Sequence, residues 1–227
     1  MRRTGGHVAS SNVAPRRVHR ARRLSLLVST GVLSLALTTS IAGATPTTTT
    51  DPGLLPQTSA EPSFGVSFQH QMHALWSDVS HNNVTRAHDL FFPRSAYVKM
   101  KTGLLAYPQS DYAQRLLAFF DLDIAAYHRF LFIGGAPRLV AVRVNRGDAA
   151  WIAPGHCENL IGYWHLPGVR LVYRHGAKVY SVGVASLISW RGVWYVVHLG
   201  PNPRPTNVGT IDSPSSGPGV PGPAGGC

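Results

Sequence analysis

The segment "KVYSVGVASLISWRGVWYVVHLG", residues 178–200, determines the fold that the sequence predicts. It contains two runs rich in β-branched and aromatic residues, separated by the dipeptide Arg191-Gly192. A two-residue link of this kind joins only antiparallel neighbours. The segment therefore predicts a β-hairpin with the strands Lys178–Trp190 and Val193–Leu199, and Gly183 is a position for a bend or bulge in the longer strand.

The two-residue turn also fixes the expected register of this hairpin. One apolar face, suited to packing under helices, is expected to carry the pairs Trp190–Val193, Ile188–Tyr195 and Ser186–Val197. The opposite face is expected to carry the pairs Ser189–Trp194, Leu187–Val196 and Ala185–His198. Because this second face is apolar too, it needs a cover, which a second copy, the returning tail or a ligand can supply.

The rest of the chain predicts helices first and strands afterwards. Apolar residues at helical spacing predict a helix from Phe68 to Val79, and Asn83 can cap a short second helix that ends before Pro93. A helical turn is expected over 95–101, and a longer helix capped by Ser110 is expected to end at Gly134-Gly135. Further strands are expected at 138–144, 149–152, 159–166 and 169–174, with tight links at 145–148, 167–168 and 175–176. This order predicts an α+β fold with N-terminal helices on a curved antiparallel meander.

The N-terminus has the pattern of an export signal. The first 23 residues contain seven arginines and no acid, and an apolar run follows that ends in Ala42-Gly43-Ala44. We expect residues 1–44 to be the signal, with cleavage after Ala44 and an extracellular or cell-envelope location. The alternative is an uncleaved signal anchor, which is the only membrane association expected. The Sec and twin-arginine routes both stay open.

Composition divides the remaining chain into three parts. Residues 45–62 are a Thr/Pro-rich linker, interpreted as disordered, 63–200 are the α+β domain, and 201–227 are a flexible Pro/Gly-rich tail. Beyond the signal, 14 Lys and Arg face 10 Asp and Glu. This ordinary charge gives no reason to expect a nucleic-acid partner.

A family resemblance rests on two segments. The helix pair "MHALWSDVSHNNVTRAHDLFFP" and the closing hairpin "SLISWRGVWYVVHLG" resemble the cone-shaped superfamily of nuclear transport factor two and the ketosteroid isomerases, a cystatin-like α+β architecture. The whole chain also resembles uncharacterised exported bacterial proteins that end in a Gly/Pro-rich tail with a final Cys. The resemblance implies helices closing over a curved sheet, and it favours a homodimer formed through the sheet.

Cys157 lies between His156 and Glu158, which suggests a nucleophile, a metal ligand or half of a disulfide. Adjacent residues of an extended chain point in opposite directions, so the three residues do not form a catalytic group by adjacency alone. An exported protein with two cysteines favours a disulfide, here between Cys157 and Cys227. Pairing between two chains and a reactive thiol are the alternatives.

The histidines and acids provide no recognisable catalytic or metal motif. His70 and His73 have metal-compatible spacing on a helix, but no carboxylate or Cys completes a site, so a surface role is favoured and neither metal nor cofactor is expected. We expect Asp121 and Asp123 to face solvent or to cap neighbours. The catalytic Tyr and Asp of a ketosteroid isomerase have no match, so no catalytic residue is assigned.

These observations favour a non-enzymatic module that binds a small apolar ligand or a protein. Its pocket is expected between the helices and the sheet, lined by Trp76, Trp190 and Tyr195. The alternatives are a cyclase- or isomerase-type enzyme using a pocket carboxylate or His198, and a structural, oligomer-forming envelope protein. A buried ionisable group in the pocket separates the first two, because an all-apolar pocket cannot perform acid–base chemistry.

Overall fold

The hairpin at residues 178–198 forms the middle and one end of the sheet. The structure is a computed structural model that describes residues 50–223, so the expected signal with Ala44, and Cys227, lie outside the described residues. Strand β4 (Lys178–Trp190) pairs with β5 (Val193–His198) across a turn in which Arg191 and Gly192 both have positive φ, as a type I′ turn requires. The predicted hairpin is confirmed.

Its expected register is correct near the turn and wrong further from it. Four of the expected pairs form, from Trp190–Val193 to Leu187–Val196. A bulge then shifts the pairing, so that Ser186 lies opposite His198 and not opposite Val197. An extra residue in one strand is common next to functional sites because it redirects a side chain. The extra residue is Val197 of β5, which lies between the pairs Leu187–Val196 and Ser186–His198. The expected position, Gly183 of β4, lies opposite Arg170 without a break in register.

Strand β3 (Tyr163–His175) is continuous, and the expected turn at Pro167-Gly168 is wrong. Pro167 pairs with Ser186 of β4 inside the strand. On the other side of β3, β1 (Arg138–Arg143) and β2 (Ala150–Ile152) pair with its two ends and leave the middle to neither strand. Pro167 is tolerated because no neighbouring strand needs its missing N–H there.

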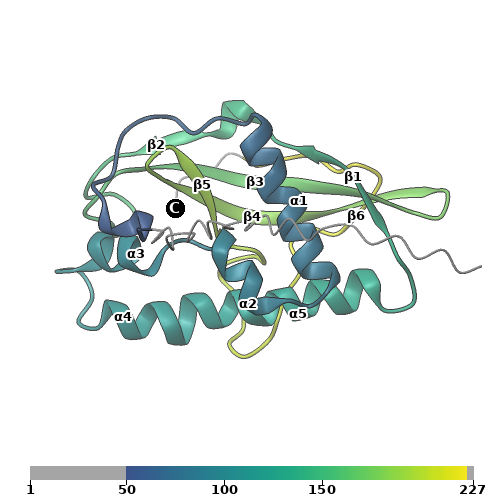
Figure 1. Cartoon of the computed structure of the whole chain (residues 1–227), viewed down its shortest axis with the longest axis horizontal. Helices are drawn as coiled ribbons and strands as arrows, with labels where there is room; N and C mark the ends of the chain where they lie inside the picture. The colour runs from purple at the N-terminus through teal and green to yellow at the C-terminus, as the bar shows by residue number, and fades with distance from the viewer. Residues whose placement is uncertain (1–49, 224–227) are drawn as a thin grey trace, which may run out of the picture. The chain divides into compact units, whose positions relative to one another are not determined.

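The named strands of the sheet all pair antiparallel within the described residues, as expected. Its order is β1-β3-β4-β5, with β2 also on β3 and the two-residue β6 (Ser215–Ser216) on β4. The link at 145–148 is a 3-10 turn between two strands that both pair with β3, so it is not a hairpin. Residues 50–223 thus form an α+β structure, in which helices precede the sheet strands (Figure 1).

The helices are close to the expected positions. They are α1 (Val66–Ser80), α2 (Val84–Ala87), α3 (Arg94–Lys101), α4 (Pro108–Asp111), the π-helical segment η3 (Tyr112–Leu117) and α5 (Ala118–Phe132), with short 3-10 turns at Pro52–Leu54 and His88–Leu90. The Asn83 side chain accepts from the Arg86 amide at 3.1 Å, which confirms the expected cap. The expected cap Ser110 is wrong, because the helix already begins at Pro108, a residue suited to a first turn.

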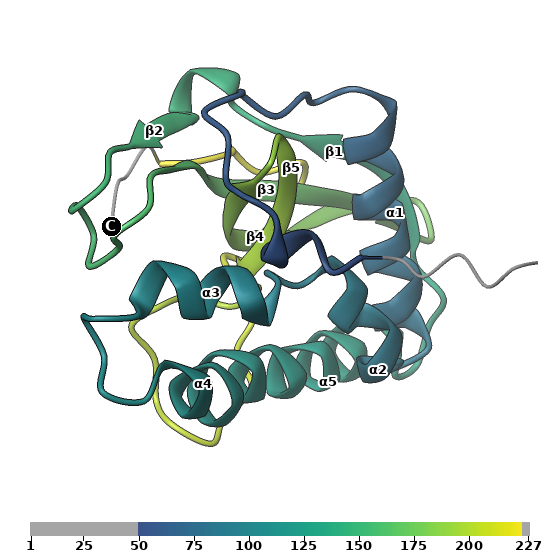
Figure 2. The same cartoon turned by 60° about the vertical axis from the view of Figure 1, so that its left-hand side comes forward.

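The helices cover the core, and α1 contacts both α5 and β1. In Figures 1 and 2, α4 and α5 form one long rod, and α1 crosses towards the sheet beside β1. The largest fully buried side chains come from all these layers and include Trp190, Tyr127, Phe68, Phe120 and Leu166. No helix within residues 50–223 is long and apolar enough to cross a membrane.

The second face of the hairpin is covered by the chain itself. Trp194 stacks on Phe64, with ring centroids 5.5 Å apart, and its carbonyl accepts from Gln71 of α1. Leu187 and Val196 on this face are fully buried. This face is therefore covered by α1 and the segment before it, and not by a second copy, the returning tail or a ligand as expected.

The linker and the tail both pack on the domain, which corrects the interpretation of these segments as disordered and flexible where the structure describes them. On the N-terminal side, Gln57 donates to the Ser189 carbonyl, and Trp190 and Trp164 donate their indole N–H groups to the carbonyls of Pro52 and Ser59. These polar groups need partners when the aromatic rings are buried, and the linker backbone supplies them.

The tail follows α5 and β4 back across the domain. The Thr210 amide donates to Asp123 and the Asp212 amide to the Tyr127 hydroxyl, at 2.8 and 2.9 Å. Further along, the Gly222 amide donates to the Gly168 carbonyl, in the gap that β1 and β2 leave beside β3. The tail thus satisfies backbone and side-chain groups that would otherwise be buried unpaired.

Candidate functional site

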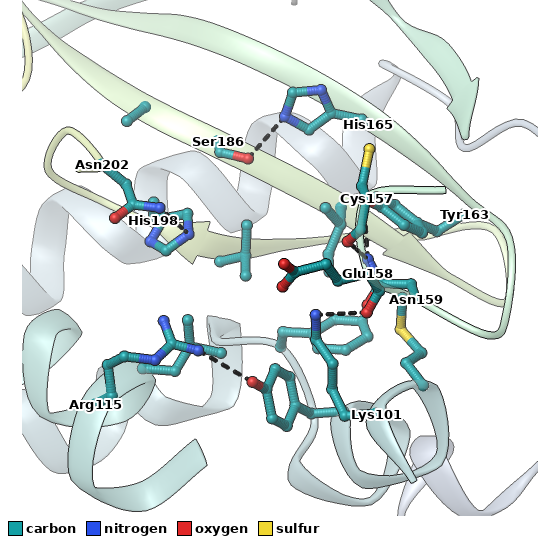
Figure 3. Close-up of a pocket in the computed structure, with 17 residues that line it drawn as sticks. Lys101, Arg115, Cys157, Glu158, Asn159, Tyr163, His165, Ser186, His198 and Asn202 are labelled. Carbon is teal, nitrogen blue, oxygen red and sulfur yellow. Dashed lines mark hydrogen bonds between the residues drawn. The ribbon is translucent and has the colours of Figure 1, made fainter. Parts of the chain in front are cut away.

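A cavity of about 570 Å³ lies between α3, η3 and the bulged end of the sheet (Figure 3). The sheet contributes residues of β3, β4 and β5, and the loop before β3 closes one side. This volume is typical of small-molecule sites. The apolar lining is Phe92, Tyr97, Met100, Leu116, Tyr163, Ala185, Ile188 and Val197, and the polar lining is Lys101, Arg115, Cys157, Glu158, Asn159, His165, Ser186, His198 and Asn202.

His198 reaches the cavity because of the bulge in β5. The bulge places it opposite Ser186, and both side chains line the cavity. Burial, followed by the positive charges of Arg115 and Arg204, lowers the pKa of His198 to about 4. The imidazole is therefore neutral at pH 7, so it can both donate and accept a hydrogen bond. Asn202 Nδ2 lies 3.5 Å from its Nε2 atom.

A second histidine lies on the sheet side of the cavity. His165 Nε2 and Ser186 Oγ, on neighbouring strands β3 and β4, are hydrogen-bonded at 2.8 Å. The pair is diagonal, since His165 lies opposite Ile188 and Ser186 opposite Pro167. The bond fixes the ring and presents a hydroxyl and an imidazole together to the cavity (Figure 3).

The helix side of the cavity has a cluster built around Arg115. Its Nε and Nη2 atoms donate to the two carboxylate oxygens of Asp111 at 2.7 and 2.6 Å, and Nη2 also donates to the Tyr97 hydroxyl at 3.1 Å. These bonds from Arg115 hold the pKa of Asp111 below its usual range, while burial raises the pKa of Tyr97. The bidentate geometry holds the guanidinium rigidly at the cavity wall.

Lys101, the last residue of α3, lies beside this cluster. Its Nζ donates to the Glu158 carbonyl at 2.7 Å and lies 5.9 Å from the centre of the Tyr97 ring. Burial lowers the pKa of Lys101, and the charge of Glu158 partly opposes this effect. In Figure 3 the Glu158 carboxylate points into the cavity, towards the space between Lys101 and His198.

The loop at Cys157 brings two of the three adjacent residues to the cavity. Cys157 and Glu158 both have positive φ, and the Asn159 side chain donates to the Cys157 carbonyl at 2.8 Å. Cys157 and Glu158 line the cavity, whereas His156 is exposed and does not line it. The sequence interpretation that the three form no catalytic group by adjacency agrees with this arrangement. Cys157 is not a free thiol, but the disulfide to Cys227 stays a prediction because Cys227 lies outside the described residues.

Three aromatic residues expected to line the pocket lie elsewhere. Trp76 packs against Phe132 and Tyr173, Trp190 is fully buried beside Pro52, and Tyr195 contacts the ring of Phe92, whereas the cavity lining includes none of the three. Large rings fill close-packed space most effectively, and the core takes them. His198, which the sequence suggested as a polar residue of the pocket, does line the cavity.

Several residues of the site are missed by reasoning from sequence. Lys101 and Arg115 belong to helices whose apolar stripes attract attention first, and His165 lies in a strand next to an expected turn. The only available signal is Ser186, a small polar residue within the apolar run "VASLISW". The four residues become one site only through the tertiary fold.

Neither a metal-binding group in the described residues nor a similar known protein helps to identify this site. Residues 50–223 contain no group of three or more His, Cys, Asp or Glu side chains arranged to hold a metal. No protein-family model, curated protein or solved structure matches the chain. The class of the protein is therefore defined by its own fold and site: an α+β protein with a mixed polar and apolar cavity between helices and sheet.

Proposed function

We propose that the protein is an exported, non-enzymatic binding module that holds a small ligand in the cavity between α3, η3 and the sheet. The observation that carries the proposal is the cavity itself, with a volume of about 570 Å³ and a lining to which three strands, two helical segments and three connecting segments contribute. A concave site with an apolar wall and a few convergent polar groups is the usual form of a small-molecule site.

The lining supports a ligand with both an apolar body and a polar group. Met100, Leu116, Ile188 and Val197 offer an apolar wall, and Lys101, Arg115 and His198 offer hydrogen-bond donors. A purely apolar ligand would remove water from the remaining donor groups of these side chains without replacing its hydrogen bonds, which is unfavourable. The ligand is therefore amphipathic and not simply apolar.

Fluorescence titration with N-phenyl-1-naphthylamine, a neutral apolar dye, tests whether the cavity binds small molecules. We expect saturable binding to the mature protein, and we expect Ala185→Trp, which fills the cavity, to abolish it. Val140→Trp is the matched control, because Val140 is half exposed on β1 and does not line the cavity. Binding that survives Ala185→Trp in a protein with unchanged circular dichroism contradicts a ligand site in this cavity.

A cyclase- or isomerase-type enzyme is the second candidate, because ionisable groups line the cavity. Glu158 and His198 both line it, and a carboxylate or imidazole can remove a proton next to a carbonyl. His198 is a weak base at neutral pH because its pKa is about 4. Exchange of the α-protons of cyclohexanone in D₂O, followed by NMR, tests this candidate: a rate above background that falls in Glu158→Gln or His198→Gln favours the enzyme.

The location and assembly need separate tests. N-terminal sequencing of protein recovered outside the cell is expected to begin at Thr45, and an intact N-terminus in the membrane fraction would favour the signal anchor. Light scattering at high concentration tests the homodimer. Because Trp194 and Val196 are already covered within the chain, a dimer would use another face of the sheet than the one expected.

A further inference from the structure

The charged groups of the cavity are unevenly distributed. Lys101 and Arg115 line its helix side, and Glu158 is the one acidic residue among the lining residues that the structure describes. Asp111, which neutralises part of the Arg115 charge, lies behind it and does not line the cavity. The neighbouring positive charges also disfavour protonation of His198, which indicates a positive potential inside the cavity.

Both cations retain hydrogen-bond donors that residues 50–223 do not use. Arg115 donates through Nε and Nη2, which leaves its Nη1 group available. Lys101 donates one hydrogen bond, to the Glu158 carbonyl, and an ammonium has three donors. Donors that converge on one cavity are arranged to receive a negatively charged group.

The backbone that carries Arg115 is itself unusual. Arg115 lies in the π-helical segment Tyr112–Leu117, between α4 and α5. Such segments are rare and are frequently found at functional sites, because the wider turn redirects side chains. Here the bidentate contact with Asp111 four residues earlier fixes the guanidinium at the cavity.

Without a ligand, the Glu158 carboxylate supplies the negative charge that faces the two cations. Its carboxylate points into the cavity towards the space between Lys101 and His198 (Figure 3). Its charge acts on Lys101, because it favours the protonated form of that ammonium. The side chain is exposed and belongs to a loop residue, so it can move away when a ligand enters.

We propose that the cavity is specific for an amphipathic organic anion. The charged head of this ligand is bound by Lys101 and by Nη1 of Arg115, and it displaces the Glu158 carboxylate. The apolar body of the ligand lies against Ile188 and Val197. This inference rests on the proposed binding function and specifies the chemical class of the ligand.

Competition between two ligands that differ only in the head group tests the proposal. N-phenyl-1-naphthylamine is bound to the full mature protein and is displaced either by decanoate or by decan-1-ol. We expect the wild-type protein to prefer decanoate by about tenfold, the factor typical of one charge-assisted hydrogen bond. Lys101→Gln is expected to reduce this preference to about one, whereas Glu158→Gln is expected to increase decanoate affinity several-fold, with decanol affinity unchanged in both variants.

Lys99→Gln is the matched control, since Lys99 lies on the same helix but does not line the cavity, and its preference should stay at the wild-type value. Equal competition by decanoate and decanol in the wild-type protein overturns the anion proposal and leaves the binding function standing. A decrease in decanoate affinity in Glu158→Gln has the same consequence, even if Lys101→Gln fails to fold. If the dye does not bind and decanoate does not bind either when it is titrated directly in a calorimeter, both the binding function and the anion proposal fail.

Discussion

Asp123→Asn tests how strongly the C-terminal tail is tied to the domain. Asp123 is 1% exposed and accepts hydrogen bonds from the amides of Gly200 and Thr210, each at 2.8 Å. Arg204 Nη1 lies 2.5 Å from its Oδ2 atom, and the Arg204 side chain is only 2% exposed. One carboxylate therefore satisfies three donors from the tail side of the chain.

The magnitude follows from what the amide removes. Asparagine keeps the size of the side chain, but it loses the negative charge and turns one acceptor into a donor that faces another donor. Leaving a buried partner charge uncompensated costs about 3–5 kcal/mol. With a urea dependence of about 2 kcal/mol per molar, the midpoint of unfolding should fall by about 1.5–2.5 M.

The measurement is urea unfolding followed by tryptophan fluorescence, with Asp121→Asn as the control. Asp121 lies two residues away on α5 and pairs with His88 at 2.7 Å, but both side chains are more than one third exposed. An exposed pair contributes about 0.2–1 kcal/mol, so the control should change the midpoint little. If the two variants unfold at the same midpoint, the buried contact does not stabilise the fold and the reasoning is refuted.

Three further predictions concern the tail, the cavity and the thiol groups. A Cβ added at Gly209 would lie 2.1 Å from the Leu122 carbonyl oxygen, so Gly209→Ala should lower the free energy of unfolding by about 1–3 kcal/mol in the same urea assay. Because the pKa of His198 is about 4 when folded and 6.5 when unfolded, the unfolded chain binds the extra proton between these values. Stability should therefore fall as the pH drops from 7 to 4, by up to about 3 kcal/mol, and His198→Gln should lose this component in unfolding curves across the same range. Thiol titration of the mature, unfolded protein should find no free thiol, and reduction should lower stability by about 4 kcal/mol for a ring of about 70 residues joining Cys157 to Cys227; two free thiols per chain would exclude the disulfide.

Local patterns predict most of the secondary structure. The bounds of β4 were predicted from the sequence, and the apolar stripe from Phe68 to Val79 coincides with the buried residues of α1. Asn83 caps its helix as expected. In each case the deciding signal lies within a few residues of the element, where periodicity, turn chemistry and capping act directly.

The failures depend on neighbours distant in the sequence. Pro167 predicts a turn, but the gap between β1 and β2 lets it remain inside a strand. The bulge is at Val197 of β5, opposite Leu187 and Ser186, and not at the glycine of β4, Gly183. Composition alone also misleads for residues 51–62, because a linker without a core can still supply hydrogen-bond acceptors to another segment.

The candidate site is predictable only in part for the same reason. His198 attracts attention because it interrupts an apolar strand, and it does line the cavity. Lys101, Arg115 and Glu158 come from a helix end, a π-helical segment and a loop, and no spacing in the sequence relates them. Their convergence is a property of the assembled layers.

The packing of both chain ends determines when the fold can be completed. The bond from the Trp190 indole to the Pro52 carbonyl joins residues 138 positions apart, and the bond from the Asp212 amide of the tail to the Tyr127 hydroxyl joins residues 85 positions apart. During synthesis, the N-terminal segments therefore cannot form these contacts until the C-terminal segments have been synthesised. Contacts of such long sequence separation slow folding and prolong the exposure of unpaired strands to aggregation. We therefore expect the unfolded chain to remain accessible to chaperones throughout its synthesis.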